Sequence, residues 1–374
     1  MRLDFCPSLF FGGFMADLKD MYTAEVLTEF AWAFVEVEAD FPVQRFLAEV
    51  TQGDWKALSL RQRHERLAHV LVACLDRPFE QVADFLELVG VRVQGFRYLF
   101  LPDVVSLFGL EHFAASMRAL TVLTASSSAE FAIRPFLKRD FERTFEQLQR
   151  WALSENEHQR RLASEGVRPN LPWGQKIPDL DQYRLEIWGL LENLKADPSL
   201  YVRKSVANHL NDWTRTHPEE VLDLLEGWQG YSPDTDWIVK RAARTLLKAG
   251  HPRALALFGY RSREDLEQVT WNFPPKIHKG ERLLLDYELE VGQAGPLRLE
   301  LQVDFRKPTG RVGQKSFMLK DRETASLRGT WSYEWVDKTT RKHWDGPHAL
   351  RLLLNGQVLL EGQLEVTGFA DKKI

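Results

Sequence analysis

The sequence predicts an α-helical repeat array followed by a smaller all-β sandwich. Three features support this prediction. Apolar residues recur every three to four positions up to about residue 260, polar triads repeat in the second half of that region, and β-rich runs follow about residue 268. The chain has 374 residues, of which 44% are hydrophobic and 27% are charged. This ordinary globular composition excludes a disordered or collagen-like chain, and the length allows two or three domains.

The helical region is expected to begin shortly after the N-terminus. Proline and glycine lie between its apolar segments rather than inside them, as helix ends require. The clearest helical spacing predicts helices at Glu25–Phe34, Leu58–Cys74, Phe79–Val89 and Phe141–Ala152. We therefore expect residues 1–15 to be an N-terminal extension and residues 16–265 to form the helical domain.

Three polar triads indicate a repeat. They are Gln159–Arg161, Val202–Lys204 and Val239–Arg241, and their first residues lie 43 and 37 positions apart. Each triad is expected to open a helix, and this spacing lies in or near the roughly 40–47 residues of HEAT-type helical pairs. Such pairs stack into a solenoid. Basic residues at the same point of successive helices would then form a stripe that suits a duplex backbone.

The C-terminal region has a different pattern. Short alternating or β-rich runs, separated by turns, predict about seven strands, as in an immunoglobulin-like sandwich. The sequence Asn355-Gly356 between two apolar runs is a strong hairpin signal. We predict that residues 266–374 form this domain. Its clearest strands are expected at Leu283–Leu289, Leu297–Phe305, Trp331–Val336, Ala349–Leu354 and Val358–Val366.

Composition also narrows the function. The net charge is −4, and neither predicted domain is strongly basic, so contact with a polyanion has to come from local clusters. No apolar run is long enough for a membrane-spanning helix. The two cysteines cannot form a disulfide framework, which indicates a reducing compartment, and we expect a cytoplasmic protein. His-Glu pairs do not recur in one register, so no metal or other cofactor is expected.

Several motifs resemble the AlkC-type DNA glycosylases of the AlkC/AlkD superfamily of HEAT-like repeats. The resemblance extends over roughly residues 16–370, and its C-terminal part points to the subgroup with an appended immunoglobulin-like domain. The motifs are Leu18–Tyr22, Ser128–Phe136, Arg160–Gly166, Arg168–Trp173, Tyr201–Asp212, Trp237–Arg241, Leu255–Tyr260 and Thr339–Trp344.

The resemblance implies a monofunctional DNA repair enzyme. It would hydrolyse the N-glycosidic bond of cationic bases such as 3-methylcytosine, 1-methyladenine and 3-methyladenine in duplex DNA, without fully flipping the base. It would act as a monomer associated with the bacterial nucleoid during repair. A cationic base is already a good leaving group, so the enzyme needs negative charge beside the sugar and a base that positions water.

The motif matches assign the catalytic roles to Glu130, Glu165, Asp212 and Trp173. Glu130 is the leading carboxylate, although it could also be a first-turn helix acid. Asp212 shares the task of water activation or sugar stabilisation. Glu165 could equally be an ion-pair partner of the neighbouring arginines. Trp173 lies in a Pro-rich loop, where it could contact the sugar or the cationic base, or latch the adjacent helices.

Basic residues of the helical motifs and of two loops in the sandwich are candidate DNA contacts. About half of those in the helical domain should contact DNA, because in a HEAT repeat the first basic residue of a triad often stabilises the neighbouring turn. In the helical domain they are Arg134, Arg160, Arg161, Arg203, Lys204, Lys240 and Arg241, and in the sandwich they are Lys279, Arg341, Lys342 and His343.

Two other functions agree with the same fold. A member of this superfamily could bind distorted or branched DNA without cleaving it, or the HEAT repeats could be a protein-binding scaffold. The presence of Glu130, Trp173 and Asp212 together argues against simple DNA binding, because binding to a polyanion needs no carboxylates. A scaffold would show no dependence on DNA lesions.

Overall fold

The structure is a computed structural model that describes residues 18–369, except residues 308, 339 and 340. The predicted extension, residues 1–15, lies outside the described residues. The described chain forms two compact units. The first runs to Trp213 and includes Trp228–Ala242, and the second consists of Thr214–Gly227 and the chain from Ala243 onward. Each unit is described by itself below.

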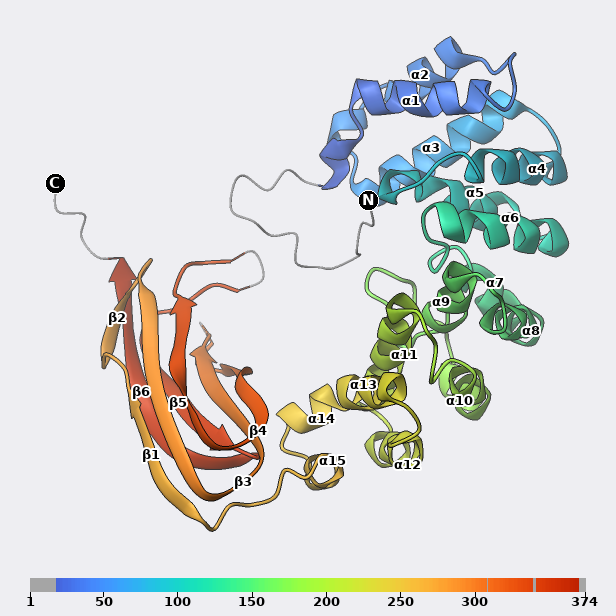
Figure 1. Cartoon of the computed structure of the whole chain (residues 1–374). Helices are drawn as coiled ribbons and strands as arrows, with labels where there is room; N and C mark the ends of the chain where they lie inside the picture. The colour runs from blue at the N-terminus through green and yellow to red at the C-terminus, as the bar shows by residue number, and fades with distance from the viewer. Residues whose placement is uncertain (1–17, 308, 339–340, 370–374) are drawn as a thin grey trace. The chain divides into compact units, whose positions relative to one another are not determined.

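The predicted succession of a helical region and a strand-rich region is confirmed (Figure 1). No helix among the described residues is long and apolar enough to cross a membrane. Short 3-10 helices lie at Leu18–Met21, Trp55–Ala57, Phe96–Tyr98 and Leu180–Tyr183. The α-helices of the described chain are α1 (Ala24–Val35), α2 (Val43–Thr51), α3 (Leu60–Leu75), α4 (Phe79–Gly90), α5 (Phe100–Phe108), α6 (Phe113–Ser126), α7 (Arg134–Arg139), α8 (Phe141–Ala152), α9 (Glu157–Glu165), α10 (Arg184–Glu192), α11 (Leu200–Trp213), α12 (Pro218–Trp228), α13 (Pro233–Ala242), α14 (Arg244–Lys248) and α15 (Pro252–Leu257).

Local capping explains where several of these helices begin. Before α3, Ser59 and Gln62 form a capping box, so the helix begins at Leu60 rather than at the predicted Leu58. The side chain of Asp140 accepts a hydrogen bond from the Arg143 N–H at 3.1 Å and caps α8. Asp197 performs a similar function before α11, where its Oδ1 accepts from the Ser199 N–H at 2.8 Å.

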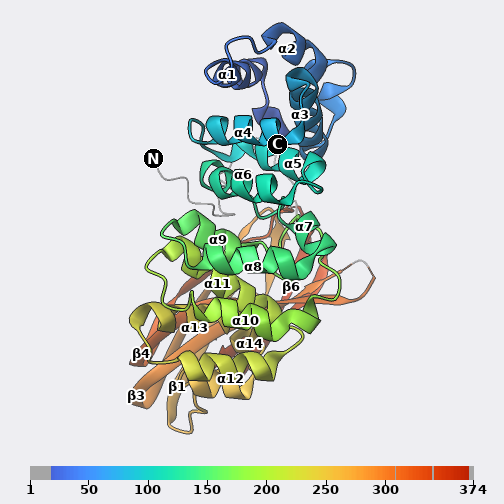
Figure 2. The same ribbon diagram turned by 90° about the vertical axis from the view of Figure 1, so that its right-hand side faces the viewer.

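The helices of the first unit pack as neighbouring pairs. Helix α9 packs against α11, and α11 packs against α13, so the three helices that carry the triads lie side by side (Figures 1 and 2). One feature of the predicted register is wrong. The triad Val239–Arg241 lies near the end of α13, not at its start, because Ser232 and Pro233 begin that helix earlier. Its basic residues therefore lie about one turn further along their helix than those of α9 and α11.

The strands of the second unit form one sheet with the order β1-β3-β5-β6-β2, in which β4 also pairs with β3. Side chains of these strands, including Leu285, Leu299, Leu352 and Leu364, form a buried apolar core together with Trp335, which follows β4. The strands are β1 (Leu266–Asn272), β2 (Lys276–Lys279), β3 (Arg282–Arg306), β4 (Val312–Glu334), β5 (Gly346–Leu354) and β6 (Gln357–Phe369).

The predicted number of strands is corrected. Leu283–Leu289 and Leu297–Phe305 are two halves of the single long strand β3, so the described residues form six strands rather than about seven. The register of β3 against β4 is irregular between Glu290 and Gly295, where the prediction had placed a turn. The first half of β3 pairs with β1 and the second half pairs with β5. The two halves of β3 therefore pair with different neighbouring strands.

Candidate active site

A chain of charged side chains joins three segments of the first unit. Glu130 lies in the turn before α7, Arg161 and Glu165 lie on α9, Arg168 follows α9, and Asp212 lies near the end of α11. The packing of α9 against α11 brings these segments together. Three carboxylates and two guanidinium groups are therefore joined in one network, and the buried guanidinium of Arg134 also acts electrostatically on Glu165 and Asp212.

Glu130 forms the first end of this network. Its Oε2 accepts a hydrogen bond from Nη1 of Arg161 at 3.0 Å, and its Oε1 accepts from Nη2 at 3.4 Å. The same Nη1 donates to the hydroxyl of Ser128 at 2.8 Å. The guanidinium of Arg161 also lies 4.9 Å from the ring centroid of Tyr201. Glu130 is therefore not a capping residue of α7 but a buried partner of Arg161.

Glu165 and Asp212 share the second arginine. Nη1 of Arg168 donates to Oε1 of Glu165 at 2.5 Å, and Nε of Arg168 donates to Oδ2 of Asp212 at 3.0 Å. The hydroxyl of Ser205 donates to Oε2 of Glu165 at 2.5 Å. The backbone N–H of Asn170 donates to Oδ2 of Asp212 at 3.2 Å. Both oxygens of Glu165 are thus bonded.

Asp212 differs from the other two carboxylates. Among the described residues, its hydrogen bonds all fall on Oδ2, whereas both oxygens of Glu130 and of Glu165 accept bonds. The side chain of Asp212 is also slightly exposed, at 11% of its surface. Asp212 therefore has one carboxylate oxygen, Oδ1, that is available to a water molecule.

The pKa values of Asp212, Glu165 and Tyr201 are shifted in different ways by their surroundings. Burial raises the pKa of Asp212 above its ordinary value, although Arg168 opposes this shift. Burial would also raise the pKa of Glu165, but Arg161 and Arg168 outweigh it and lower the pKa. Burial raises the pKa of the Tyr201 phenol to about 12, so this group stays protonated at neutral pH. Asp212 is the stronger base of the two carboxylates whose pKa is shifted.

Trp173 lies at the exposed tip of the loop that follows α9. Its side chain is 69% exposed, and its backbone φ of 63° is in the left-handed region, which a bulky residue adopts only at a cost. Hydrogen bonds hold the loop on both sides of this tip. Nζ of Lys176 donates to the carbonyl of Pro169 at 2.9 Å, and Asn170 is bonded to Asp212. An exposed and strained aromatic residue is typical of a functional loop.

The predicted DNA contacts in the helical region fall into two groups. Arg134 and Arg161 are buried, and their guanidinium groups bond to groups of the protein. Arg160 forms two bonds to Asp197, at 2.6 and 3.0 Å. Arg203 bonds to the carbonyls of Asp197 and Pro198 and forms an ion pair with Asp234. By contrast, Lys240 and Arg241 are exposed, and Lys204 is half-buried.

In the sandwich, the predicted contacts also separate by burial. His343 is buried, and burial lowers its pKa to about 4, so its ring is neutral at neutral pH. Lys279 forms an ion pair with Asp345 at 2.5 Å. Lys342 is exposed, and the guanidinium of Arg341 lies 4.2 Å from the ring centroid of Phe305. Residues 339 and 340 of the matched loop lie outside the described residues.

A further cationic group lies beside Arg341. Burial lowers the pKa of Lys315, and the positive charges of Arg341, Lys338 and Lys248 lower it further. The ammonium groups of Lys315 and Lys338 lie 4.8 Å from the ring centroids of Phe317 and Tyr333, respectively. The sequence prediction did not include Lys248, Lys315 or Lys338, because they lie in three separate segments.

The network contains five residues to which the prediction gave no catalytic or DNA-binding role: Ser128, Arg168, Asn170, Tyr201 and Ser205. A signal was present in α11. Tyr201, Ser205 and Asp212 are four and seven positions apart, which places them on one face of a helix. Arg161 and Glu165, four apart on α9, form the facing polar stripe. The packed faces of neighbouring helices are normally apolar. Polar residues on the facing sides of α9 and α11 could therefore have indicated the site.

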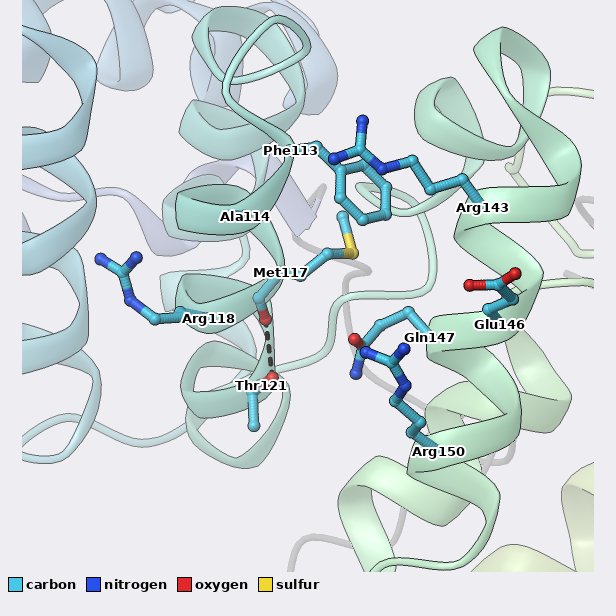
Figure 3. Close-up of a pocket in the computed structure, with 9 residues that line it drawn as sticks. All are labelled: Phe113, Ala114, Met117, Arg118, Thr121, Arg143, Glu146, Gln147 and Arg150. Atoms are coloured by element: carbon cyan, nitrogen blue, oxygen red, sulfur yellow. Dashed lines mark hydrogen bonds between the residues drawn. The ribbon is translucent and has the colours of Figure 1, made fainter.

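Two grooves in the first unit lie elsewhere. One lies between α6 and α8 and is lined by Phe113, Met117, Arg143 and Gln147, among other residues (Figure 3). The other is lined by residues 90–94, by the second half of α6, and by Asn156 and Gln159. Neither groove contains any of the four predicted catalytic residues. The charged network is therefore distinct from both.

Comparison with known proteins identifies the class of this chain. Residues 121–248 match the family described as DNA alkylation repair enzyme. Residues 268–368 match the family described as the C-terminal Ig-like domain of the uncharacterised protein YhaZ. The chain thus combines a helical repeat domain of the DNA alkylation repair class with an immunoglobulin-like domain, which confirms the predicted fold class.

Two relatives cover nearly the whole chain. The uncharacterized protein YhaZ of Bacillus subtilis is 39% identical over 350 residues, which cover 92% of this chain and 98% of the relative. The structure of the Pseudomonas fluorescens alkylpurine DNA glycosylase AlkC, bound to DNA containing an abasic site analog, is 38% identical. It matches with a TM-score of 0.88 over 94% of this chain and 100% of that chain. The chain belongs to this AlkC and YhaZ family of DNA alkylation repair glycosylases, as its motifs predicted.

Proposed function

We propose that this protein hydrolyses the N-glycosidic bond of cationic alkylated bases in duplex DNA, with water as the nucleophile. Its substrates would include 3-methylcytosine, 1-methyladenine and 3-methyladenine. The similarity to AlkC, whose structure contains DNA with an abasic site analog, supports DNA as the partner and base release as the reaction. The observation that carries the proposal is the buried carboxylate network that ends at Asp212.

The chemistry requires negative charge near the sugar. When the N-glycosidic bond breaks, positive charge develops on the deoxyribose, as it does in glycoside hydrolysis. Arg161, Arg168 and the nearby Arg134 offset most of the charge of the three carboxylates, so the negative charge offered to the sugar is concentrated at the available Oδ1 of Asp212, where burial reduces its screening by water. A base that already carries a positive charge leaves without a strong general acid. The network therefore has the charge that this transition state needs.

Within the network, Asp212 is proposed to hold the attacking water. Its Oδ1 is available, and its raised pKa makes it a better proton acceptor than an ordinary aspartate. Glu130 and Glu165 are proposed to supply the remaining negative charge while they keep Arg161 and Arg168 in place. No lysine among the described residues hydrogen-bonds to these three carboxylates, which favours water over a lysine nucleophile.

Trp173 is proposed to pack against the sugar or the cationic base. Its exposed ring has an electron-rich face, and such a face stabilises a neighbouring cation by about 0.5–2 kcal/mol. We propose that the base stays largely in the duplex, as the resemblance to the AlkC-type glycosylases implies. Charge on the base should then matter more than its size.

The proposed DNA contacts are those cations that the structure leaves exposed or half-buried. In the helical region they are Lys204, Lys240 and Arg241. In the sandwich they are Arg341 and the exposed Lys342, together with Lys315 and Lys338; the positive charges of Arg341 and Lys338 act on Lys315 and lower its pKa. Repulsion of this kind is relieved when a phosphate binds. We propose a monomer, because each of these contacts can be made by one chain.

The first experiment measures base release under single-turnover conditions from a duplex with one 3-methylcytosine. We expect release by the wild type and its loss in Asp212→Asn and Glu130→Gln. The matched control is Glu186→Gln, an exposed acid on α10 that should keep full activity. A duplex with uracil should stay intact, because uracil is neutral.

The outcomes separate the alternatives. No release from the 3-methylcytosine duplex, or from matching duplexes with 1-methyladenine or 3-methyladenine, while DNA is still bound, would indicate the non-catalytic DNA-binding protein. Excision of uracil as fast as 3-methylcytosine would contradict the role of base charge. An Asp212→Asn variant with full activity would remove Asp212 from the mechanism and leave Glu130 as the catalytic carboxylate.

A further inference from the structure

Arg134 is buried at the start of α7, and its guanidinium is bonded to the loop that carries Trp173. Nε donates to the carbonyl of Gln175, and Nη1 donates to the carbonyls of Gly166 and Arg168 at 2.8 and 3.1 Å. The residue is only 1% exposed. One planar side chain therefore joins the beginning and the end of the loop 166–175.

The sequence around Arg134 is adapted to this contact. A Cβ atom at Gly166 would lie 2.7 Å from Cγ2 of Ile133, so glycine allows the loop to approach the turn that precedes α7. Lys138, on the next turn of α7, donates from Nζ to Oε1 of Gln175 at 3.1 Å. Helix α7 thus holds the far end of the loop by two side chains.

The loop connects this clamp to the proposed catalytic groups. Between its two clamped ends it contains Arg168 and Asn170, which both donate to Oδ2 of Asp212, and Trp173. Trp173 lies at the exposed tip of the loop, and its backbone conformation is strained. A strained conformation persists only when its surroundings fix it.

We propose that Arg134 is a positioning residue that fixes the loop 166–175, so that Trp173 and Asp212 are held in their reactive arrangement. This inference rests on the proposed function. It replaces a phosphate contact at Arg134, because a guanidinium that is buried and bonded to three carbonyls offers no exposed group to DNA. Lysine could not replace it, since one ammonium cannot span both ends of the loop.

Limited proteolysis tests the clamp without any assay of catalysis. The usable trypsin site closest to the loop lies directly after it, at the exposed Lys176, because Pro169 blocks cleavage after Arg168 within the loop. We expect Arg134→Lys and Arg134→Met to be cut after Lys176 at least about tenfold faster than the wild type, because the loop opens locally. The fragments would be residues 1–176 and 177–374. The control is Arg139→Met, an exposed arginine of α7 that pairs with Glu111.

The kinetic test uses single-turnover base release and DNA affinity together. We expect Arg134→Lys to lose about 100-fold in rate, because small displacements of catalytic groups have effects of this size. DNA affinity and its dependence on salt should be unchanged. Trp173→Ala should reduce the rate of base release much less in the Arg134→Lys background than in the wild type, because the two residues act through one loop.

Several results would overturn the proposal. Unchanged cleavage at Lys176 in both variants would show that Arg134 does not fix the loop. A weaker, less salt-dependent DNA affinity in Arg134→Lys would restore the phosphate contact. If neither variant folds, as judged by thermal melting, Arg134 is required for folding and is not a positioning residue. A wild type without base release would refute the proposed function, while proteolysis would still test the clamp.

Discussion

Replacing Asp212 by asparagine removes the negative charge of this side chain while it keeps the hydrogen bonds. Both hydrogen bonds to Asp212, from Arg168 and Asn170, fall on Oδ2. The amide oxygen of asparagine can accept the same two bonds. The variant therefore keeps the contacts and loses the negative charge and the basic Oδ1.

The expected loss of rate follows from the role of a general base. Such a group contributes about 10²–10⁴-fold, which corresponds to roughly 3–5 kcal/mol at 1.36 kcal/mol for each factor of ten. Stability should not fall in parallel. Because the folded protein raises the pKa of Asp212, ionised Asp212 costs folding free energy at neutral pH. This cost is present above the folded pKa and vanishes below the unfolded pKa of about 3.9. Asp212→Asn should melt at or above the wild-type temperature at pH 7.

The assay is single-turnover release of 3-methylcytosine from pH 4.5 to 8, with thermal melting at each pH. In the wild type, the rate should fall about tenfold per pH unit below the pKa of Asp212, since only the ionised form accepts a proton. Burial raises this pKa, so the fall should begin at a higher pH than for an ordinary aspartate. The residual rate of Asp212→Asn should not show this fall.

Two results would refute this reasoning. One is a residual rate in Asp212→Asn that keeps the wild-type pH profile, because the titrating base would then be another group. The other is a melting temperature at pH 7 that falls by many degrees, because the charge of Asp212 would then stabilise the fold.

Three further predictions concern stability and DNA affinity. Glu165→Gln should lower the free energy of unfolding by about 3–5 kcal/mol at pH 7, as expected when one partner of a buried ion pair is removed. The folded protein lowers the pKa of Glu165. In urea titrations, the difference in free energy of unfolding between the wild type and Glu165→Gln should therefore have its full size above about pH 4–5 and disappear as the pH falls through the folded pKa. Trp173→Gly should lose base-release activity and melt no lower than the wild type, because glycine relieves the left-handed strain; a large drop in melting temperature would make Trp173 a structural latch. Lys338→Ala and Lys342→Ala should each reduce the slope of log affinity against log salt by about one, whereas Lys56→Ala should not; equal slopes in all three would exclude the sandwich from DNA binding.

Local sequence patterns predicted the elements well. Helices α1, α4 and α8 lie where the apolar spacing placed them, because their buried face is a property of the segment itself. The same is true of the hairpin at Asn355-Gly356, where both residues adopt positive φ. Local patterns were less successful where an element depends on its neighbours. The two expected strands around Glu290 are one long strand, because its pairing with β4 resumes on the far side of the irregularity.

The motifs also selected the residues of the network, but not their arrangement. Glu130, Glu165 and Asp212 were chosen from three separate segments, and the structure joins them through Arg161 and Arg168. Nothing in the local sequence distinguishes an arginine that is bonded to carbonyls from one that is exposed to a phosphate. Sequence-based selection therefore placed buried and exposed cations in one group.

The sequence by itself determined the succession of helices and strands, the family, and the residue types at the site. Each of these depends on side chains a few positions apart, or on motifs read directly from the chain. The tertiary structure alone decided that Asp212 keeps an available oxygen, that Arg134 clamps the loop of Trp173, and that His343 is buried and neutral. Burial and hydrogen-bond partners arise from contacts between distant segments, and they set the charge and the accessibility on which the chemistry depends.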